Sequence, residues 1–129
     1  MNLEDPFKSG DFLPDMQATD RWQAIDELIG LLVSRGKIAS EHQHAVAEAV
    51  KSRERVACTA VGFGVALPHA ETGLVKEVVG VAGRSKSGID FEAADQVPVK
   101  KVLLFLIPKG ESQKHLRVLA NMAKSIHKF

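Results

Sequence analysis

The sequence feature that most constrains the fold is an uninterrupted apolar run near the end of the chain. Residues 102–107 are Val-Leu-Leu-Phe-Leu-Ile, and Pro108 and Gly110 close the run. Successive side chains of a strand point to opposite faces of its sheet, so a strand that is apolar at every position must be covered on both faces. The run therefore predicts a buried strand with other elements packed against both sides.

Three segments have the apolar spacing of amphipathic helices. The first follows a cap at Thr19 or Asp20 and stops at Gly36, and the second starts with a plausible capping box of Ser40 and Gln43. The side chains expected on the buried faces are Trp22, Ile25, Leu28, Ile29, Leu32 and Val33 in the first helix, Ala45, Val46, Ala49 and Val50 in the second, and, after a cap at Ser112, Leu116, Leu119, Met122, Ala123 and Ile126 in the third.

Between the second and third helices the sequence has the character of strands. An extended segment broken by Gly62 and Gly64 is followed by a stretch rich in valine and glycine. An arm at residues 1–18 precedes the first helix. The expected strands lie in residues 11–16, 59–67, 75–84 and 102–107, with a short strand inside the loop at 88–98. Helices combined with a buried strand predict an α/β sandwich, and the length of 129 residues predicts a single domain, 1–129.

Composition excludes several classes of function. The chain has 17 basic and 16 acidic residues, without a basic stripe, which argues against nucleic-acid binding. Its apolar runs are too short to span a bilayer, and the N-terminus lacks the basic region of a secretory signal. Cys58 is the single cysteine, and it is expected to be a small buried side chain. Together these features predict a cytoplasmic protein.

The stretch that carries the most chemistry is residues 59–71. Pro68 fixes its own φ and restricts the residue before it, so His69 is expected to be held at the end of a strand. The Gly62-x-Gly64 pattern is expected to offer exposed backbone amides around the imidazole. A neutral imidazole can attack through one ring nitrogen if the other donates its proton to a fixed acceptor, for which a nearby backbone carbonyl is the first candidate. The alternative is a structural or merely exposed histidine.

Other chemistries fit the sequence poorly. The two glycines lack the rest of a dinucleotide fingerprint and of a P-loop. His42 and His44 would point about 200° apart on a helix and cannot share a metal from one face, so no metal site is expected. A Ser-His-Asp hydrolase lacks its Gly-x-Ser-x-Gly motif.

Arg53 and His115 gain meaning only together with His69. By itself Arg53 is a cation near the end of the second helix, where it interacts favourably with the negative end of the helix dipole. His115 by itself is a partly buried residue at the start of the third helix. If the three converge, Arg53 would disfavour protonation of His69 and then pair with a phosphoryl group carried on it. The second imidazole would supply a further donor to the phosphoryl oxygens.

This constellation coincides with a known signature. Glu54, six residues, and then residues 61–70 (Val-Gly-Phe-Gly-Val-Ala-Leu-Pro-His-Ala) resemble the signature of the type-2 enzyme IIA domains of the bacterial phosphoenolpyruvate-dependent phosphotransferase system, the fructose/mannitol/nitrogen-regulatory class. The resemblance runs from about residue 11 to the last residue. Further positions that are similar to the family are Arg53, Thr59, Asp95-x-x-Pro98-Val99 and His115-Leu116-x-x-Leu119-Ala120.

The resemblance implies a role for each matching residue. His69 corresponds to the histidine that accepts a phosphoryl group from phosphorylated HPr, or an HPr-like carrier, through Nε2 and passes it to a IIB domain. Arg53 and His115 correspond to the arginine and second histidine that hold the phosphoryl group. The positions implied to support the phosphoryl site are Thr59, Gly64 and Pro68. The implied fold is a mixed β-sheet sandwiched by α-helices, and no cofactor is implied.

Two departures from the family pattern leave alternatives open. Ala70 stands where glycine is commonest, and family domains usually continue past residue 129 with at least one more helix. The resemblance therefore implies either a clipped C-terminus or a short form. It leaves open whether a second subunit, in a homodimer, covers the seam exposed by the missing piece or whether that exposed seam lowers stability. It also leaves open whether the protein serves sugar transport, regulates partner proteins in the manner of nitrogen-regulatory IIA proteins, or is an inert binding module.

Overall fold

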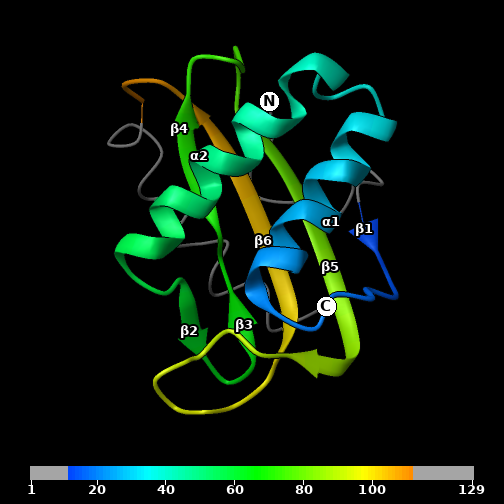
Figure 1. Cartoon of the computed structure of the whole chain (residues 1–129), viewed down its shortest axis with the longest axis vertical. Coiled ribbons are helices and arrows are strands. Elements are labelled where there is room, and N and C mark those ends of the chain that lie inside the picture. Colours follow the sequence, from blue (N-terminus) through cyan, green and yellow to red (C-terminus); the bar gives the residue numbers. More distant parts are fainter. Residues whose placement is uncertain (1–11, 112–129) are drawn as a thin grey trace.

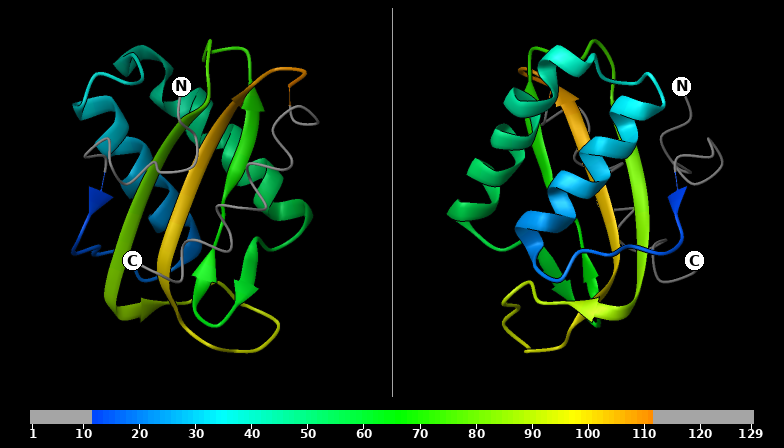
Figure 2. Two further views of the ribbon diagram at one scale, coloured as in Figure 1. Left: turned by 180° about the vertical axis from the view of Figure 1, so that it is seen from behind. Right: turned by 45° about the vertical axis from the view of Figure 1, so that its right-hand side comes forward.

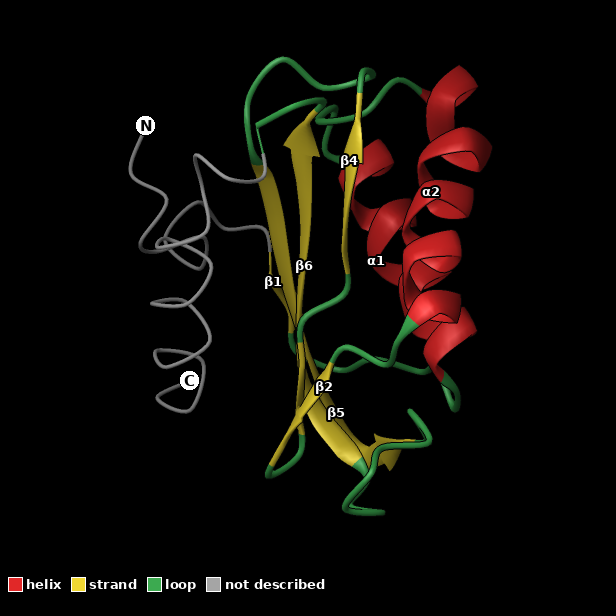
Figure 3. Ribbon diagram, turned by 90° about the vertical axis from the view of Figure 1, so that its left-hand side faces the viewer, coloured by secondary structure: helices red, strands yellow, loops and turns green. Residues whose placement is uncertain are grey.

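A mixed β-sheet with two helices packed against one face makes up residues 12–111, the part of the chain that the computed structural model describes (Figures 1 and 3). Both helices lie over β4, β5 and β6 of this sheet. The elements in chain order are β1 (Phe12–Leu13), α1 (Arg21–Ser34), the 3₁₀ turn η2 (Ser40–His42), α2 (Gln43–Val56), β2 (Ala60–Gly62), β3 (Val65–Ala66), β4 (His69–Thr72), β5 (Val79–Ile89) and β6 (Val99–Pro108).

Strand β6 is the centre of the sheet, as the apolar run predicts. It pairs antiparallel with β5 along one side, and parallel with both β3 and β4 along the other. Figure 2 shows the gold β6 from behind, between β5 and β4. The order along the sheet is β1-β5-β6-β3-β2, with β4 also on β6, and residues 102–108 are all buried. The predicted buried strand is confirmed.

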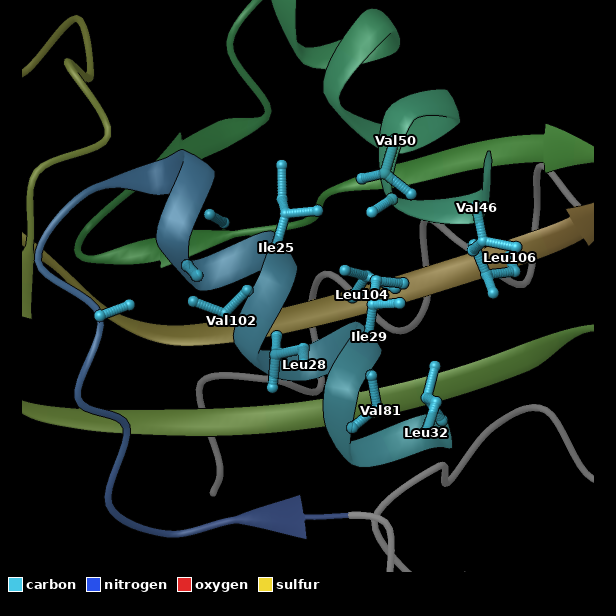
Figure 4. Packing of buried hydrophobic residues seen from close by; sticks show 14 of the residues in the cluster. Ile25, Leu28, Ile29, Leu32, Val46, Val50, Val81, Val102, Leu104 and Leu106 are labelled. Carbon is cyan, nitrogen blue, oxygen red and sulfur yellow. The ribbon is translucent and has the colours of Figure 1, made fainter. Parts of the chain in front are cut away.

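The main core lies between the sheet and the two helices (Figure 4). Helix α2 packs over β4 and helix α1 over β5, so α2 overlies the strand that begins with His69. Leu104 and Leu106 of β6 and Ile29 of α1 are fully buried there. On the opposite face of the sheet Leu103 and Phe105 belong to a second buried cluster. The third predicted helix, which begins at Ser112, lies outside the described residues.

The first helix begins as predicted, and the second does not. Asp20 caps α1 by accepting a 2.8 Å hydrogen bond from the backbone N–H of Gln23. Ser40 instead opens a 3₁₀ turn, and α2 starts without any side-chain cap, so the predicted capping box is wrong. Helix α2 also runs to Val56 rather than ending near residue 53. Its buried face contains Ala47, whereas the predicted Ala45 is exposed.

Short strands account for the other differences. Residues 59–67 form the β2–β3 hairpin, and the strand predicted at 75–84 instead covers Val79–Ile89. His69 begins β4 rather than ending a strand, because its register partner on β6 is Phe105 and pairing continues to residue 72. The short strand expected within 88–98 is limited to an isolated bridge between Asp90 and Asp20.

Within residues 12–111, no helix combines the length and apolarity needed to cross a bilayer.

Candidate active site

The imidazole of His69 is held by a backbone carbonyl. His69 is half-buried, and its Nδ1 lies 2.9 Å from the carbonyl oxygen of Leu67. A carbonyl can only accept a hydrogen bond, so Nδ1 carries the hydrogen, and in the neutral ring Nε2 keeps its lone pair. The prediction that a backbone carbonyl orients this ring is confirmed. The geometry gives a nucleophilic nitrogen on the side of the ring away from Leu67.

Pro68 and its neighbours fix the position of that carbonyl. The Pro68 carbonyl accepts a 3.0 Å hydrogen bond from the N–H of Phe105 in β6, and Pro68 itself is buried. On the other side the N–H of Leu67 donates to the Thr59 carbonyl at 3.1 Å. Because proline also confines Leu67 to extended backbone angles, the Leu67 carbonyl has little freedom to turn. Pro68 therefore acts on the imidazole through the main chain.

Arg53 lies in the last turn of α2 and lines the same pocket as His69. This pocket has a volume of about 360 Å³ and is also lined by Ala49, Ala70 and Glu71. The Arg53 Nη1 donates a 3.0 Å hydrogen bond to the carbonyl of Ala57, just past the end of the helix. A guanidinium has five N–H donors, so this bond holds Arg53 without exhausting its capacity to bind an anion.

Glu71 places a carboxylate at the rim of this pocket. Its Oε2 accepts a 2.8 Å hydrogen bond from the backbone N–H of Gly110, in the turn that follows β6. Residues 69 and 71 project to the same side of β4 because strand side chains alternate. The pocket thus combines an imidazole, a guanidinium and a carboxylate.

Thr59 supports the site from behind rather than lining it. Thr59 is buried, and its hydroxyl donates to Oε1 of Glu54 at 2.6 Å while its N–H donates to Oε2 at 3.0 Å. The hydroxyl is therefore already used by Glu54. The sequence identifies Glu54 only as a signature position and misses this role. A glutamate five residues before a threonine, at the end of a helix, was the available signal.

Gly64 forms a turn that joins the hairpin to β6. It has a φ of 79°, and its carbonyl accepts hydrogen bonds from the N–H groups of Lys100 and Lys101 at 2.8 and 3.1 Å. The N–H of Phe63 in this turn donates to Asp95 at 3.2 Å. The expectation of exposed amides around the imidazole is therefore wrong for Phe63, because a carboxylate already satisfies its amide.

The remaining candidates lie elsewhere. His115 falls outside the described residues. Cys58 is exposed rather than buried, with its Sγ 3.3 Å from the Phe91 carbonyl, so its prediction as a core residue is wrong. Among residues 12–111, no three histidine, cysteine, aspartate or glutamate side chains are grouped as metal ligands. A second pocket, of about 410 Å³, is lined by Thr19 and residues of the 87–98 segment, and it contains no histidine.

Comparison with known proteins places this chain in a family. The family model described as "Phosphoenolpyruvate-dependent sugar phosphotransferase system, EIIA 2" matches residues 6–128. A nitrogen regulatory protein of Bradyrhizobium diazoefficiens is 35% identical over 87% of this chain and 71% of its own length. The fructose-specific EIIA component of the phosphotransferase system of Haloferax volcanii is 36% identical over 80% of this chain and 66% of its own length.

A solved structure supports the same assignment. The nitrogen regulatory protein IIA-Ntr from Neisseria meningitidis superimposes with a TM-score of 0.80 and 26% identity, covering 98% of this chain and 80% of that one. The predicted fold class and the predicted EIIA identity are both confirmed. The chain belongs to the EIIA 2 family of the phosphoenolpyruvate-dependent sugar phosphotransferase system.

Proposed function

We propose that His69 accepts a phosphoryl group on Nε2 and passes it to a partner protein. The observation that carries this proposal is the hydrogen bond from Nδ1 of His69 to the Leu67 carbonyl, which leaves the Nε2 lone pair available. Membership of a phosphotransferase-system family supplies the chemistry for which such a nitrogen would be used. His69 would be a phosphoryl acceptor and donor, with no net change after one cycle.

The transfer itself is a displacement at phosphorus. The Nε2 lone pair forms a bond to phosphorus as the bond to the donor nitrogen breaks, and the donor ring keeps that electron pair. The imidazole of His69 gains positive charge as the new bond forms. Its Nδ1–H donor becomes stronger, and the fixed Leu67 carbonyl stabilises it. Transfer to the acceptor reverses these steps.

Arg53 would neutralise the charge of the transferred group. It lines the pocket with His69 and is anchored to the Ala57 carbonyl, which holds a planar cation near the place where the phosphoryl oxygens would lie. Phosphoryl transfer depends on positioning and on charge stabilisation, and an anchored guanidinium provides both. His115 would be the second donor, as the family resemblance implies.

The donor would be phosphorylated HPr or an HPr-like carrier, and the acceptor a IIB domain. Incubation with phosphoenolpyruvate, enzyme I and HPr should place acid-labile label on the wild-type protein and none on His69→Ala. A His44→Ala variant, which changes an exposed histidine of α2, is the matched control and should be labelled like the wild type. Absence of label on the wild type would exclude the proposed phosphocarrier role.

A regulatory use of the same phosphorylation is the second candidate. It is favoured by the presence of nitrogen regulatory proteins among the similar ones, including those of Bradyrhizobium diazoefficiens and Neisseria meningitidis. The two roles separate when the phosphorylated protein is offered a IIB domain of a fructose permease. Rapid loss of label to that domain supports transport. Retention of label, together with capture of a partner by only one phosphorylation state, supports regulation.

A further inference from the structure

A buried carboxylate lies behind the active site without touching it. The Glu54 side chain is fully buried at the end of α2, and it accepts hydrogen bonds from both the hydroxyl and the amide of Thr59. Arg21 of α1 approaches the same carboxylate, with its Nη1 3.5 Å from Oε2. A buried charge is costly unless it is paired and hydrogen-bonded, and Glu54 meets both conditions.

The hydrogen bonds continue from this carboxylate to the nucleophile. Because the amide and hydroxyl of Thr59 both point at Glu54, the backbone of Thr59 is fixed. Its carbonyl then accepts from the Leu67 N–H at 3.1 Å, and the Leu67 carbonyl accepts from Nδ1 of His69 at 2.9 Å. Glu54, Thr59, Leu67 and His69 thus form one path of hydrogen bonds. It runs from the end of α2, through the residue before β2 and the residue after β3, to the start of β4.

We propose that Glu54 is a positioning residue that sets the tautomer of His69 through Thr59 and Leu67. The carboxylate fixes Thr59, Thr59 fixes the peptide that enters Leu67, and the Leu67 carbonyl then holds the hydrogen on Nδ1. Arg21 pairs with the buried carboxylate of Glu54 and also with Glu92, whose Oε2 lies 3.0 Å from Nη2 of Arg21. The consequence for phosphoryl transfer rests on the proposed function, but the tautomer can be measured without it.

A purely structural role for Glu54 makes a different prediction. If the carboxylate only stabilised the C-terminal end of α2, its loss would lower the free energy of unfolding and leave the tautomer of the His69 imidazole unchanged in the folded protein. If it positions His69, its loss must shift the hydrogen between the two ring nitrogens. The discriminating readout is therefore the ratio of the Nδ1–H to the Nε2–H form of His69.

The experiment uses the full chain labelled with ¹⁵N-histidine. Long-range ¹H–¹⁵N spectra, recorded at a pH above the usual imidazole range, report both ring nitrogens, and a His69→Gln variant assigns the His69 signals. Glu54→Gln keeps the side-chain shape but cannot accept both Thr59 donors. It should lower the Nδ1–H to Nε2–H ratio about fivefold, the effect of losing one net hydrogen bond.

Two further comparisons make the result decisive. Asp26→Asn makes the same carboxylate-to-amide change in the exposed Asp26–Lys51 pair between α1 and α2 and should leave the ratio unchanged. Thr59→Val removes the hydroxyl and should lower the ratio. Thr59→Ser retains the hydroxyl and should keep the ratio near the wild-type value. A folded Glu54→Gln protein with the wild-type ratio would overturn the proposal.

The Thr59 pair carries the test if Glu54→Gln does not fold. Equal ratios in Thr59→Val and Thr59→Ser would then overturn the proposal, and a loss only in Thr59→Val would support it. Phosphorylation by phosphoramidate, which needs no partner protein, gives a second readout, and its rate should fall with the ratio. If the Nδ1–H to Nε2–H ratio falls as expected in these variants but the wild-type protein is never phosphorylated, the result would contradict the proposed function and not this inference.

Discussion

Replacement of Arg53 by glutamine tests the role of the pocket that it shares with His69. Arg53 uses one N–H to anchor itself on the Ala57 carbonyl and retains donors for a phosphoryl group. Glutamine keeps most of the side-chain length and removes the charge. The substitution should therefore remove at least one charge-assisted hydrogen bond to the transferred group.

The magnitude follows from that bond. A hydrogen bond to a charged group contributes about 1.5–3 kcal/mol, which corresponds to a decrease of about 10- to 150-fold in the rate of phosphoryl transfer. The structural loss is smaller, because the Arg53–Ala57 bond is at the exposed end of a helix. It should lower the free energy of unfolding by about 0.5–1 kcal/mol and Tm by about 2–5 °C.

The assay compares initial rates of labelling by phosphorylated HPr, with unfolding followed by circular dichroism. Arg55→Gln is the matched control, because Arg55 lies on the same helix, pairs with Glu48 on the surface and does not line the pocket. It should transfer at the wild-type rate. Wild-type rates for Arg53→Gln would refute the assignment of this pocket, as would equal losses for the two variants.

Two substitutions test the scaffold. Leu106→Ala removes a fully buried side chain of β6 and should lower the free energy of unfolding by about 2–5 kcal/mol in a denaturant titration; a loss below about 1 kcal/mol would contradict the packing in Figure 4. Gly64→Ala forces a Cβ at positive φ to within 3.2 Å of the Pro98 carbonyl oxygen, whereas Gly36→Ala has open space at a similar φ. Both should destabilise by about 1–2 kcal/mol through backbone strain, with a clear excess at Gly64; equal losses would rule out the close approach.

The sequence predicts the parts of this fold that local pattern determines. Burial on both faces accounts for the apolar run at residues 102–107 of β6, and an Asp20 cap with helical apolar spacing specifies α1. The short strands could not be predicted, because β3 and β4 have two and four residues and exist through pairing with β6 far along the chain. Ser40 failed as a cap because the chain makes a 3₁₀ turn before the helix begins.

The candidate site also combines features that the local sequence predicts with features that it does not. The sequence identifies His69 as the candidate nucleophile and Arg53 as the candidate cation, and the structure places both in the lining of one pocket. The role proposed for Glu54 could not be predicted, because it depends on the carboxylate being fully buried against Thr59 and within reach of Arg21 on another helix. Burial and long-range approach decide such roles, and neither is a local property of the sequence.

The most direct test of the account is to locate the phosphoryl group itself. The ¹⁵N-histidine protein, phosphorylated through phosphoenolpyruvate, enzyme I and HPr, should show one modified ring in ¹H–¹⁵N and ³¹P spectra. This ring is expected to be His69, modified at Nε2, with Nδ1–H still bonded to the Leu67 carbonyl. Phosphorylation at Nδ1 of His69, or on any other histidine, would contradict it.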